Sequence, residues 1–398
     1  MTAEVGTTKR LRIAVLNRVF SPMGGGAERY SIALVEQLAQ RHEIHVFAQQ
    51  VDHQWPGVTY HKVSAPLTKP RWINQLWYAA ATWWATRRGF DVVHSHENTW
   101  HGGVQTVHVL PIRYNLFLGR TGLSRWARWL KVVTSPRLLV YLWLEHQRYA
   151  LQRGRFIVAT SQSLEAIMRT HYPHTAPMLR VITPGVSAVA GMTPDADKRA
   201  ARAALGLPQD VPCILFVGND YRKKGLDTLL EALAKLSDDV VLAVVGNPAH
   251  IAQFRAIAAS TGLVHRVFFL GSQKVMTSAY QAADCLAHPT LEDTFAMVVL
   301  EAMAHGLPVV VSGEPFCGIA GLLTHDDNAL VLSDPRDATA LAMQLQNLLQ
   351  SGFKSDSPLG SLRERLSNQA LVFARAHLWS QIALEQERLY ISSADKPS

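Results

Sequence analysis

The sequence predicts an α/β protein with two Rossmann-like, doubly wound domains. In the first half, short apolar strand-like runs alternate with helical patterns, and the second half repeats this alternation. The 398 residues also exceed what a single hydrophobic core usually supports. Ligands of parallel sheets bind at the carboxyl ends of the strands, so we expect an active site in a cleft between two facing domains.

In the first half, five apolar runs predict buried strands. They are residues 11–16, 43–48, 91–94, 104–109 and 155–160, and a helical pattern covers residues 27–40. The turn-rich segment 183–186 and the polar stretch 193–198 are typical of a linker. We therefore place the first domain at residues 1–185.

The second half repeats the alternation. Its predicted strands are residues 213–218, 240–246, 266–270, 284–287 and 308–312, and a helix is predicted over 225–236. Residues 351–361 are expected to form a surface loop, and a last helical pattern runs from about 362 to 390. The predicted second domain spans residues 186–370, and residues 371–398 are expected to form a helix that packs back on the first domain.

Composition narrows the class of protein. Apolar residues make up 48% of the chain, but no stretch approaches the roughly 20 apolar residues of a membrane-spanning helix. Residues 7–12 are polar and basic and lack a signal-peptide core, so a cytoplasmic location is expected. The three cysteines, Cys213, Cys285 and Cys317, form no Cys-x-x-Cys pair, which argues against a zinc ribbon and indicates reduced thiols.

The net charge of +8 is unevenly distributed. Residues 1–190 hold 22 Lys and Arg against 9 Asp and Glu, whereas residues 191–398 hold 17 against 22. Residues 110–155 contain nine basic residues, one acid, and interleaved Trp and Tyr. This mixture suits an anionic membrane surface, and the alternative is a solvated basic face over an ordinary helical core. Binding of nucleic acid is not favoured, because no known binding motif accompanies the charge.

Residues 290–308 carry two carboxylates around a predicted helix start, Asp293 and Glu301. Along a helix, their separation would place them about 12 Å apart axially and about 80° apart around it, so both can border one cleft. A predicted helix over 294–305 ends before Gly306 and Pro308. This span suits a nucleotide-sugar, whose diphosphate would bind the N–H groups of the first turn. The alternative is structural, with Asp293 as N-cap and Glu301 bonded in the core.

Two further loops suit an anionic ligand. Gly24, Gly25 and Gly26 follow the first strand and open a helix, where backbone can approach a phosphate; the alternative is a loop that needs positive φ. The run does not fit the Gly-x-Gly-x-x-Gly pattern of nicotinamide enzymes. In the second half, residues 222–224 place three cations by a helix start, which a diphosphate would compensate unless they form a solvated turn.

Several histidines cluster between residues 94 and 108. No His-x-x-x-His helix or Cys/His pairing supports a metal site, so none is expected. His108 ends a predicted strand, where its side chain would face the cleft. It is a candidate for the site, although a lone histidine is more often structural.

Taken together, these stretches resemble the retaining nucleotide-sugar glycosyltransferases of family 4, which have the GT-B fold. The segments that carry the resemblance are 24–29, 106–108, 183–185, 216–218 with 222–225, 269–271, 288–289 and 293–310. Within the family, residues 218–225, Ala287-His-Pro and the basic, aromatic middle of the chain are most similar to lipopolysaccharide core glucosyltransferases.

The resemblance implies a role for each matched position. Lys224 and Lys223, beside Arg222, would hold the donor diphosphate, Gly25 and Gly26 would approach it from the other domain, and His108 would contact the donor sugar. Asp293 would bind sugar hydroxyls and Glu301 the ribose. The remaining residues implied in the donor site are Thr294, Phe295, Ala296, Met297 and Val298, whose loop and N–H groups would complete the phosphate site.

One departure concerns the first acid. The family usually has Glu there, whereas this chain has Asp293 next to Glu292, so either Asp293 or Glu292 takes the role. The resemblance implies no metal and no cofactor, a UDP-sugar such as UDP-glucose, front-side attack with retention, and a lipid-anchored or lipopolysaccharide acceptor at the inner face of the cytoplasmic membrane. The alternatives are a GDP-mannose mannosyltransferase, a nucleotide-sugar epimerase on the same scaffold, and a non-catalytic protein that binds through its basic stretch.

Overall fold

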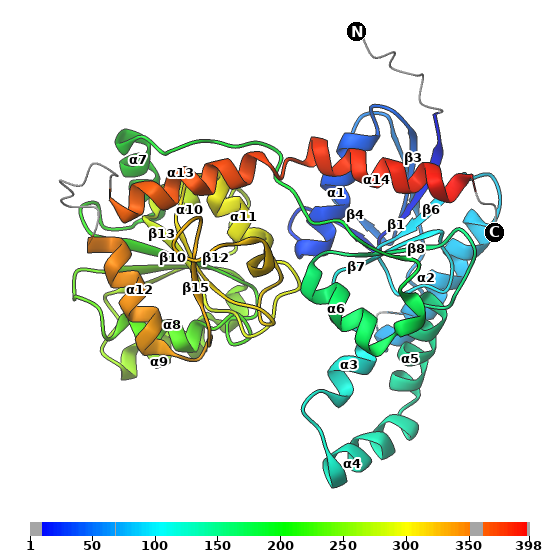
Figure 1. The fold of residues 1–398 in the computed structure, drawn as a ribbon, viewed down its shortest axis with the longest axis horizontal. Helices are drawn as coiled ribbons and strands as arrows, with labels where there is room; N and C mark the ends of the chain where they lie inside the picture. The colour runs from blue at the N-terminus through cyan, green and yellow to red at the C-terminus, as the bar shows by residue number, and fades with distance from the viewer. Residues whose placement is uncertain (1–9, 68, 351–360, 396–398) are drawn as a thin grey trace. The chain divides into compact units, whose positions relative to one another are not determined.

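A computed structural model describes residues 10–67, 69–350 and 361–395. The chain divides into two compact units (Figure 1). One comprises the described residues up to Pro184 and those from Trp379 onward, and the other comprises Gly185–Leu378. Each unit is built around a parallel sheet, so the α/β class and the GT-B architecture of two Rossmann-like domains are confirmed.

The first unit contains a seven-stranded sheet in the order β5-β3-β1-β6-β7-β8-β9. In that order the strands are Val58–Lys62, Glu43–Ala48, Arg12–Leu16, Val92–Ser95, Val104–Val107, Phe156–Ala159 and Leu179–Val181. Two short strands, β2 (Val19–Phe20) and β4 (Gln50–Val51), pair separately. All these pairings are parallel. The five predicted strands are present, and the unpredicted β5 and β9 lie at the sheet edges, where the apolar signal is weaker.

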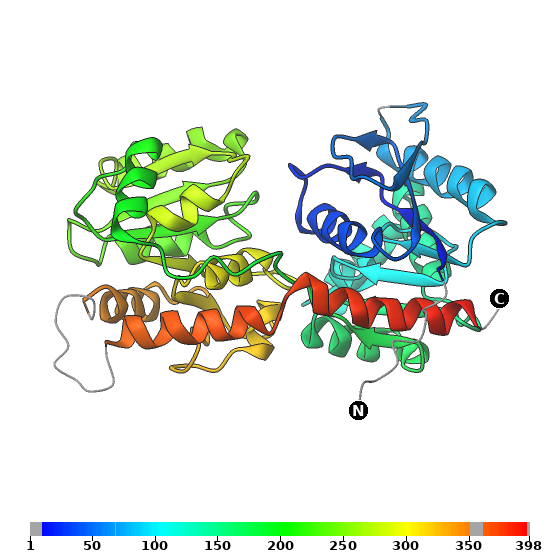
Figure 2. The ribbon, with the colours of Figure 1, turned by 90° about the horizontal axis from the view of Figure 1, so that it is seen from above.

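Seven α-helices of the first unit surround this sheet among the described residues. They are α1 (Gly26–Leu38), α2 (Arg71–Thr86), α3 (Ile112–Phe117), α4 (Gly122–Val133), α5 (Pro136–Arg148), α6 (Gln162–His171) and α14 (Trp379–Ala394), with a 3₁₀ turn at Pro173–Thr175. Figure 1 shows α4 at the far end of a projection that α3 and α5 join to the sheet. Figure 2 shows α14, in red, passing beside the strands of this unit, and α14 contacts α1, β6 and β7.

The second unit contains a six-stranded sheet in the order β12-β11-β10-β13-β14-β15. In that order the strands are Val267–Gly271, Val241–Val245, Cys213–Val217, Cys285–His288, Val309–Ser312 and Leu330–Leu332. Its α-helices are α7 (Asp195–Leu205), α8 (Leu226–Leu233), α9 (Ile251–Ser260), α10 (Thr277–Ala282), α11 (Met297–Ala304), α12 (Ala338–Gln350) and α13 (Leu362–Arg375), with 3₁₀ turns at Pro248–His250 and Gly318–Leu322. The central strands are buried on both faces, and a separate apolar core covers each face.

Two sequence predictions need correction here. The helical pattern over 362–390 is two helices, because Ala376–Leu378 leaves the helical path and Leu378 pairs with Val186. The predicted domain limit at residue 370 lies inside α13. The polar stretch 193–198 is not all linker, since Asp195 begins α7 and its first-turn acids favour a helix start.

Other expectations concern the linker, loop and thiols. The units meet in sequence at Pro184 and Gly185, within the predicted turn 183–186. Of the loop predicted at 351–361, residues 351–360 lie outside the described residues, and Ser361 caps α13. The three cysteines are buried and unpaired. In the part of the chain that the structure describes, no helix has the length and apolar character needed to cross a bilayer.

Candidate functional site

The two loops that carry the predicted cations and carboxylates lie side by side in the second unit. Strands β10 and β13 are neighbours in its sheet, so the loops that leave their carboxyl ends adjoin. The backbone N–H of Leu291 donates to the carbonyl of Lys223 over 2.9 Å, and the hydroxyl of Thr290 donates to the same oxygen. These bonds fix the 222–225 loop against the 289–296 loop.

Glycines allow this close approach. Gly225 has a φ of +81°, and a Cβ there would lie 1.9 Å from the carbonyl oxygen of Pro289. At Gly218 a Cβ would meet the side chain of Lys224 at 2.8 Å. Both positions therefore need glycine, and together they let Lys224 lie along the end of the sheet toward the second loop.

Lys224 is bound directly to the first predicted acid. Its Nζ lies 2.6 Å from Asp293 Oδ2 and donates to the carbonyl of Glu292 over 3.0 Å. Nε2 of the buried His288 lies 3.3 Å from the same Asp293 oxygen. Burial raises the pKa of Asp293, but the hydrogen bond with His288 and the charge of Lys224 outweigh it and hold that pKa well below its usual range. Burial lowers the pKa of His288, so Asp293 is the ionised member of this group.

The other two cations are more accessible. Lys223 Nζ lies 2.5 Å from Glu292 Oε1, and their side chains are 43% and 33% exposed. Arg222 is exposed, and no ion pair joins it to another residue of the described chain. The loop thus presents two accessible cations beside one that is partly enclosed, which suits a ligand with several negative charges.

The helix after this loop begins later than the sequence predicted. α11 starts at Met297, not at residue 294, because Ala296 has a φ of +71° in the left-handed region. Asp293 Oδ1 accepts hydrogen bonds from the N–H groups of Phe295 and Ala296 over 3.2 and 2.8 Å. The helical spacing predicted between Asp293 and Glu301 is therefore wrong, since the first four residues of that interval form a turn.

This turn changes which N–H groups are accessible to a phosphate. Asp293 occupies those of Phe295 and Ala296, and Thr294 is half-buried in the turn between them. Met297 and Val298 open α11, and N–H groups in a first turn have no acceptor within the helix. Of the four groups implied for phosphate binding, these two are the better placed.

The second predicted acid lies on α11. Glu301 Oε2 accepts a hydrogen bond from the hydroxyl of Tyr280 over 2.6 Å, and the Tyr280 ring stacks on His305. Glu301 is half-buried. Both structural roles considered for the two acids, turn capping by Asp293 and a buried bond of Glu301, are present as contacts in the unliganded protein.

In the first unit, the predicted glycines lie between β2 and α1. None of Gly24, Gly25 and Gly26 has a positive φ, so this loop does not need glycine for its backbone angles. A Cβ on Gly24 would meet the Glu28 side chain at 2.8 Å, and one on Gly25 would lie 3.1 Å from Glu28 Oε2. The glycines therefore leave room above the start of α1, which the Glu28 carboxylate borders in the unliganded protein.

His108 follows β7 and forms part of a histidine group. Its Nε2 lies 2.9 Å from Nδ1 of His96, which follows β6, and the ring of Tyr30 packs edge-on against it. Burial, with a smaller effect of Arg148, lowers the pKa of His108 to about 3. His108 is thus neutral at physiological pH and can donate or accept a hydrogen bond without carrying charge.

Three residues that support this group were not predicted from the sequence. His94 Nδ1 lies 2.6 Å from the hydroxyl of Tyr390 on α14, and its Nε2 lies 2.7 Å from Thr106 Oγ1 on β7. The buried Arg148 donates to Gln105 and to the carbonyl of Thr106. Tyr390 is 296 residues from His94, so no local motif could have indicated this contact. Among the described residues, no group of three His, Cys, Asp or Glu side chains is arranged to hold a metal ion.

Comparison with protein families matches both halves of the chain. Residues 24–189 match Glycosyltransferase Family 4, and residues 197–371 match Glycosyl transferases group 1. The chain belongs to the family 4 glycosyltransferases. The resemblance predicted from its motifs is confirmed at this level, and each half of the site described above lies within a matched segment.

Curated relatives of this glycosyltransferase include D-inositol 3-phosphate glycosyltransferases. The one from Corynebacterium diphtheriae is 30% identical over 254 residues, which are 60% of this chain and 56% of the relative. The match thus spans a little over half of that relative's length. The one from Actinosynnema mirum is 27% identical over 93% of this chain and 94% of the relative.

Solved glycosyltransferase structures share the fold. WaaG, a glycosyltransferase involved in lipopolysaccharide biosynthesis, superposes with a TM-score of 0.78 at 20% identity over 94% of this chain and 98% of WaaG. HepE from Anabaena in complex with UDP-glucose gives a TM-score of 0.71 at 18% identity over 96% of this chain and 100% of HepE. At these identities the likeness establishes the GT-B fold.

Proposed function

We propose that this glycosyltransferase moves a hexose from a nucleotide-sugar to a membrane-associated saccharide acceptor. The donor is UDP-glucose or a related UDP-sugar, and the acceptor is a lipid-linked saccharide such as the lipopolysaccharide core. One observation carries the donor half of this proposal. Lys224, its two cationic neighbours and the start of α11 converge at the carboxyl ends of β10 and β13.

The chemistry follows from these charges. Lys223, Lys224 and Arg222, with the first-turn N–H groups of Met297 and Val298, would neutralise the diphosphate as it leaves. No metal ion or cofactor is needed in this scheme, because the cations and the helix start supply the positive charge. Lys224 would exchange part of its contact with Asp293 for the diphosphate, and Glu301 would bind the ribose.

The proposed transfer proceeds with retention of configuration. The bond from the sugar C1 to the phosphate oxygen breaks, and the acceptor hydroxyl forms a new C1–O bond on the same face. The acceptor proton passes to the departing phosphate oxygen, so no protein nucleophile or base is required. The neutral His108 would donate a hydrogen bond to a sugar hydroxyl near the reacting carbon, and Gly25 and Gly26 would leave space for the donor phosphates.

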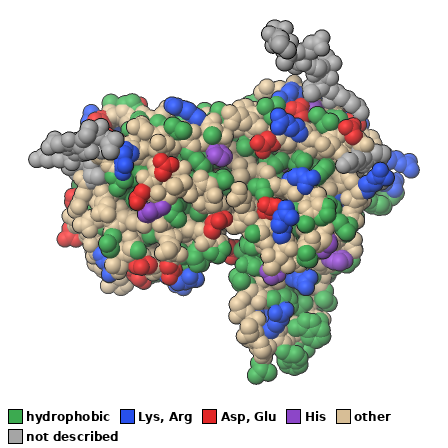
Figure 3. Space-filling view, viewed as in Figure 1, with side chains coloured by type: hydrophobic (Ala, Val, Ile, Leu, Met, Phe, Trp, Pro, Cys, Tyr) green, Lys and Arg blue, Asp and Glu red, His purple; other side chains and the backbone are tan. Residues whose placement is uncertain are grey.

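The surface of the first unit supports a membrane-bound acceptor. Figure 3 shows hydrophobic side chains gathered at the end of the projection that contains α4. The exposed apolar residues of this projection are Leu118, Leu123, Trp126, Trp129, Leu130, Val133, Leu139 and Trp143. Residues 112–148 also hold seven Lys and Arg against one acid, Glu145. This mixture suits peripheral binding to the anionic inner face of the cytoplasmic membrane.

A second candidate acceptor comes from the curated relatives. Because D-inositol 3-phosphate glycosyltransferases match most of the chain at 27% identity, a small phosphorylated polyol is the main alternative to a lipid-linked saccharide. The GDP-mannose and epimerase alternatives remain separate products of the same assay.

Calorimetry with UDP, GDP and ADP tests the donor site. We expect UDP to bind the wild-type protein without added metal and Lys224→Ala to weaken that binding at least about tenfold, because a charge-assisted contact to phosphate is lost. Lys235→Ala is the matched control, since Lys235 is exposed and has no ion pair in the described chain. Product analysis with UDP-glucose then separates transfer from epimerisation.

Each other outcome has a definite meaning. A preference for GDP would keep the transferase and replace the proposed donor. Equal affinities of the Lys224 and Lys235 variants would contradict the assigned diphosphate site. A requirement for magnesium would contradict the metal-free scheme, and folded protein that binds none of the nucleotides would refute the donor proposal.

A further inference from the structure

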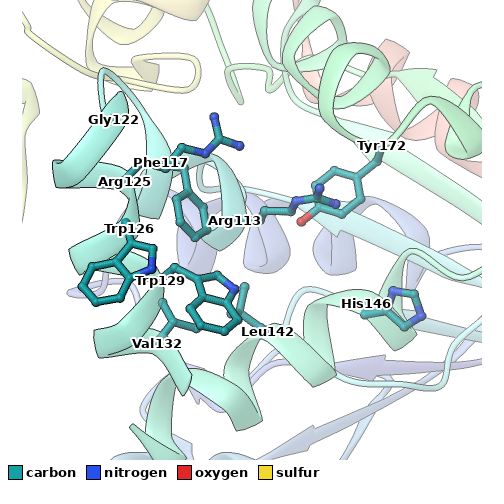
Figure 4. Close-up of a pocket in the computed structure, with 10 residues that line it drawn as sticks. All are labelled: Arg113, Phe117, Gly122, Arg125, Trp126, Trp129, Val132, Leu142, His146 and Tyr172. Carbon is teal, nitrogen blue, oxygen red and sulfur yellow. The ribbon is translucent and has the colours of Figure 1, made fainter. Parts of the chain in front are cut away.

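The projection of the first unit contains a cavity that the proposed donor site does not use. Its volume is about 670 Å³, within the range of sites that hold small organic ligands. Figure 4 shows side chains from α3, α4 and α5 around it, together with Tyr172 after α6. The cavity therefore lies wholly within one unit.

Basic side chains line part of this cavity without acidic partners. Arg113, Arg125 and His146 line it, and no acidic side chain does. The Arg125 guanidinium lies 5.6 Å from the ring centre of Phe117, and that of Arg113 lies 6.0 Å from the ring centre of Tyr172. In the described chain neither arginine forms an ion pair, so aromatic faces position both charges while their N–H groups stay accessible.

The nearest acid is already saturated. Glu145 is 3% exposed, and its carboxylate accepts hydrogen bonds from the backbone N–H groups of Ile112 and Arg113 and from the Tyr172 hydroxyl. It fixes the start of α3 and the Tyr172 ring rather than binding a guanidinium. The positive charge at the cavity is therefore left for a ligand.

The remaining walls are apolar and open toward the exposed surface of α4. Trp126 and Trp129 lie close together in Figure 4, with Val132 and Leu142 beside them. The two tryptophans are 61% and 55% exposed, so they belong both to the cavity and to the apolar patch proposed to meet the membrane. A ligand with an apolar chain can thus enter the cavity from that patch.

We propose that this cavity binds the phosphate-bearing lipid portion of the acceptor. Arg113 and Arg125 bind the phosphate, for which guanidinium groups are suited by their planar set of donors. Phe117, Trp126 and Trp129 bind the adjoining chain. This inference rests on the proposed function, because it identifies the acceptor of that transferase as a phosphorylated amphiphile.

Binding of dodecyl phosphate below its micellar concentration tests the inference. Inorganic phosphate represents the head group alone, and dodecyl glucoside represents the chain without charge. By calorimetry on the full chain, we expect dodecyl phosphate to bind saturably and at least about tenfold more tightly than either probe. The double variant Arg113→Gln/Arg125→Gln should lose about tenfold or more in affinity.

Lys131→Gln/Arg137→Gln is the matched control. It removes two charges from α4 and α5 at exposed positions outside the cavity lining. We expect it to keep dodecyl phosphate affinity within about twofold, because charges outside a site act weakly through solvent. Equal losses in the two double variants would show only a diffuse charge effect and would overturn the proposal.

The other probes separate the remaining alternatives. Inorganic phosphate binding as tightly as dodecyl phosphate would replace the lipid with a small phosphorylated ligand, and equal binding of dodecyl glucoside would leave only detergent adsorption. If Arg113→Gln/Arg125→Gln also lost vesicle binding while the control kept it, the cavity would hold bulk membrane lipid instead of the acceptor. UDP binding is measured in parallel, so that failure of the donor proposal is distinguished from failure at this cavity.

Discussion

Asp293 shows how one side chain can organise the donor loop. Its two oxygens contact Lys224, His288 and the N–H groups of Phe295 and Ala296. These contacts hold the turn in which Ala296 adopts its left-handed conformation, which costs a non-glycine residue free energy. Glu292 instead pairs with Lys223 at the surface. The two neighbouring acids therefore have separable effects on stability.

Asp293→Asn should lower the free energy of unfolding by about 1–3 kcal/mol at pH 7, because it removes the charge that Lys224 and His288 contact. Glu292→Gln should change that free energy by less than about 1 kcal/mol, since its ion pair is exposed. Urea denaturation of both variants measures the difference. Comparable losses in the two variants would contradict the buried role of Asp293, and a loss of turnover without a loss of stability in Glu292→Gln would identify Glu292 as the sugar contact.

The same pair predicts a pH dependence. The pKa of Asp293 is depressed in the folded protein, so the unfolded chain binds a proton more readily at this residue. The stabilisation is therefore complete above the unfolded pKa of about 4 and is lost as the pH falls below it. The stability gap between wild type and Asp293→Asn should narrow in denaturation curves taken between pH 5 and pH 3, as round values on either side of about 4. A gap independent of pH would mean that the carboxylate is not paired.

At the scale of elements, the last helix completes the histidine group. Tyr390 on α14 contacts His94, and Trp379 at the start of α14 packs edge-on against Tyr30, which in turn contacts His108. Burial lowers the pKa of His94 to about 3, so this histidine is neutral and needs hydrogen-bond partners rather than a counter-ion. α14 thus supports the carboxyl ends of β6 and β7 from the far end of the sequence.

Tyr390→Phe should destabilise the first unit by about 1–3 kcal/mol, because it leaves a buried ring nitrogen of His94 without its partner. Hydrogen exchange should quicken in β6 and β7 but not in β10 or β13. Tyr114→Phe is the control, since the described chain shows no hydrogen bond from the Tyr114 hydroxyl. Unchanged exchange in β6 and β7 would show that α14 does not support these strands.

The elements that the sequence predicted well are those whose signal is local. Strands such as β10 and β11 are apolar throughout because both faces are buried, whereas the polar edge strand β5 was missed. The start of α11 was misplaced because it depends on a side-chain contact of Asp293 and on the angles of Ala296. The proximity of Lys224 and Asp293 followed from adjacent strand ends, but the contact of Tyr390 with His94 depends on tertiary packing alone.

At the scale of the whole molecule, the basic and aromatic first half predicts reversible binding to anionic membranes. The protein should bind vesicles that contain phosphatidylglycerol more tightly than neutral vesicles, and binding should weaken with added salt, because the attraction of the basic residues is screened. Cosedimentation at increasing sodium chloride measures both effects. Equal binding to neutral and anionic vesicles would contradict the electrostatic part of this proposal.

The apolar part can be tested separately on α4. Leu123 and Leu130 are 87% and 44% exposed, and neither lines the cavity of the projection. Leu123→Ser/Leu130→Ser should lower vesicle affinity at least about tenfold, since burying each leucine contributes roughly 1.5–3 kcal/mol. Val264→Ser/Val275→Ser removes two exposed apolar side chains from the second unit and should leave the affinity unchanged. If both pairs lowered it equally, the membrane contact would not be specific to the projection, whereas a loss confined to α4 would place the proposed acceptor cavity at the same surface.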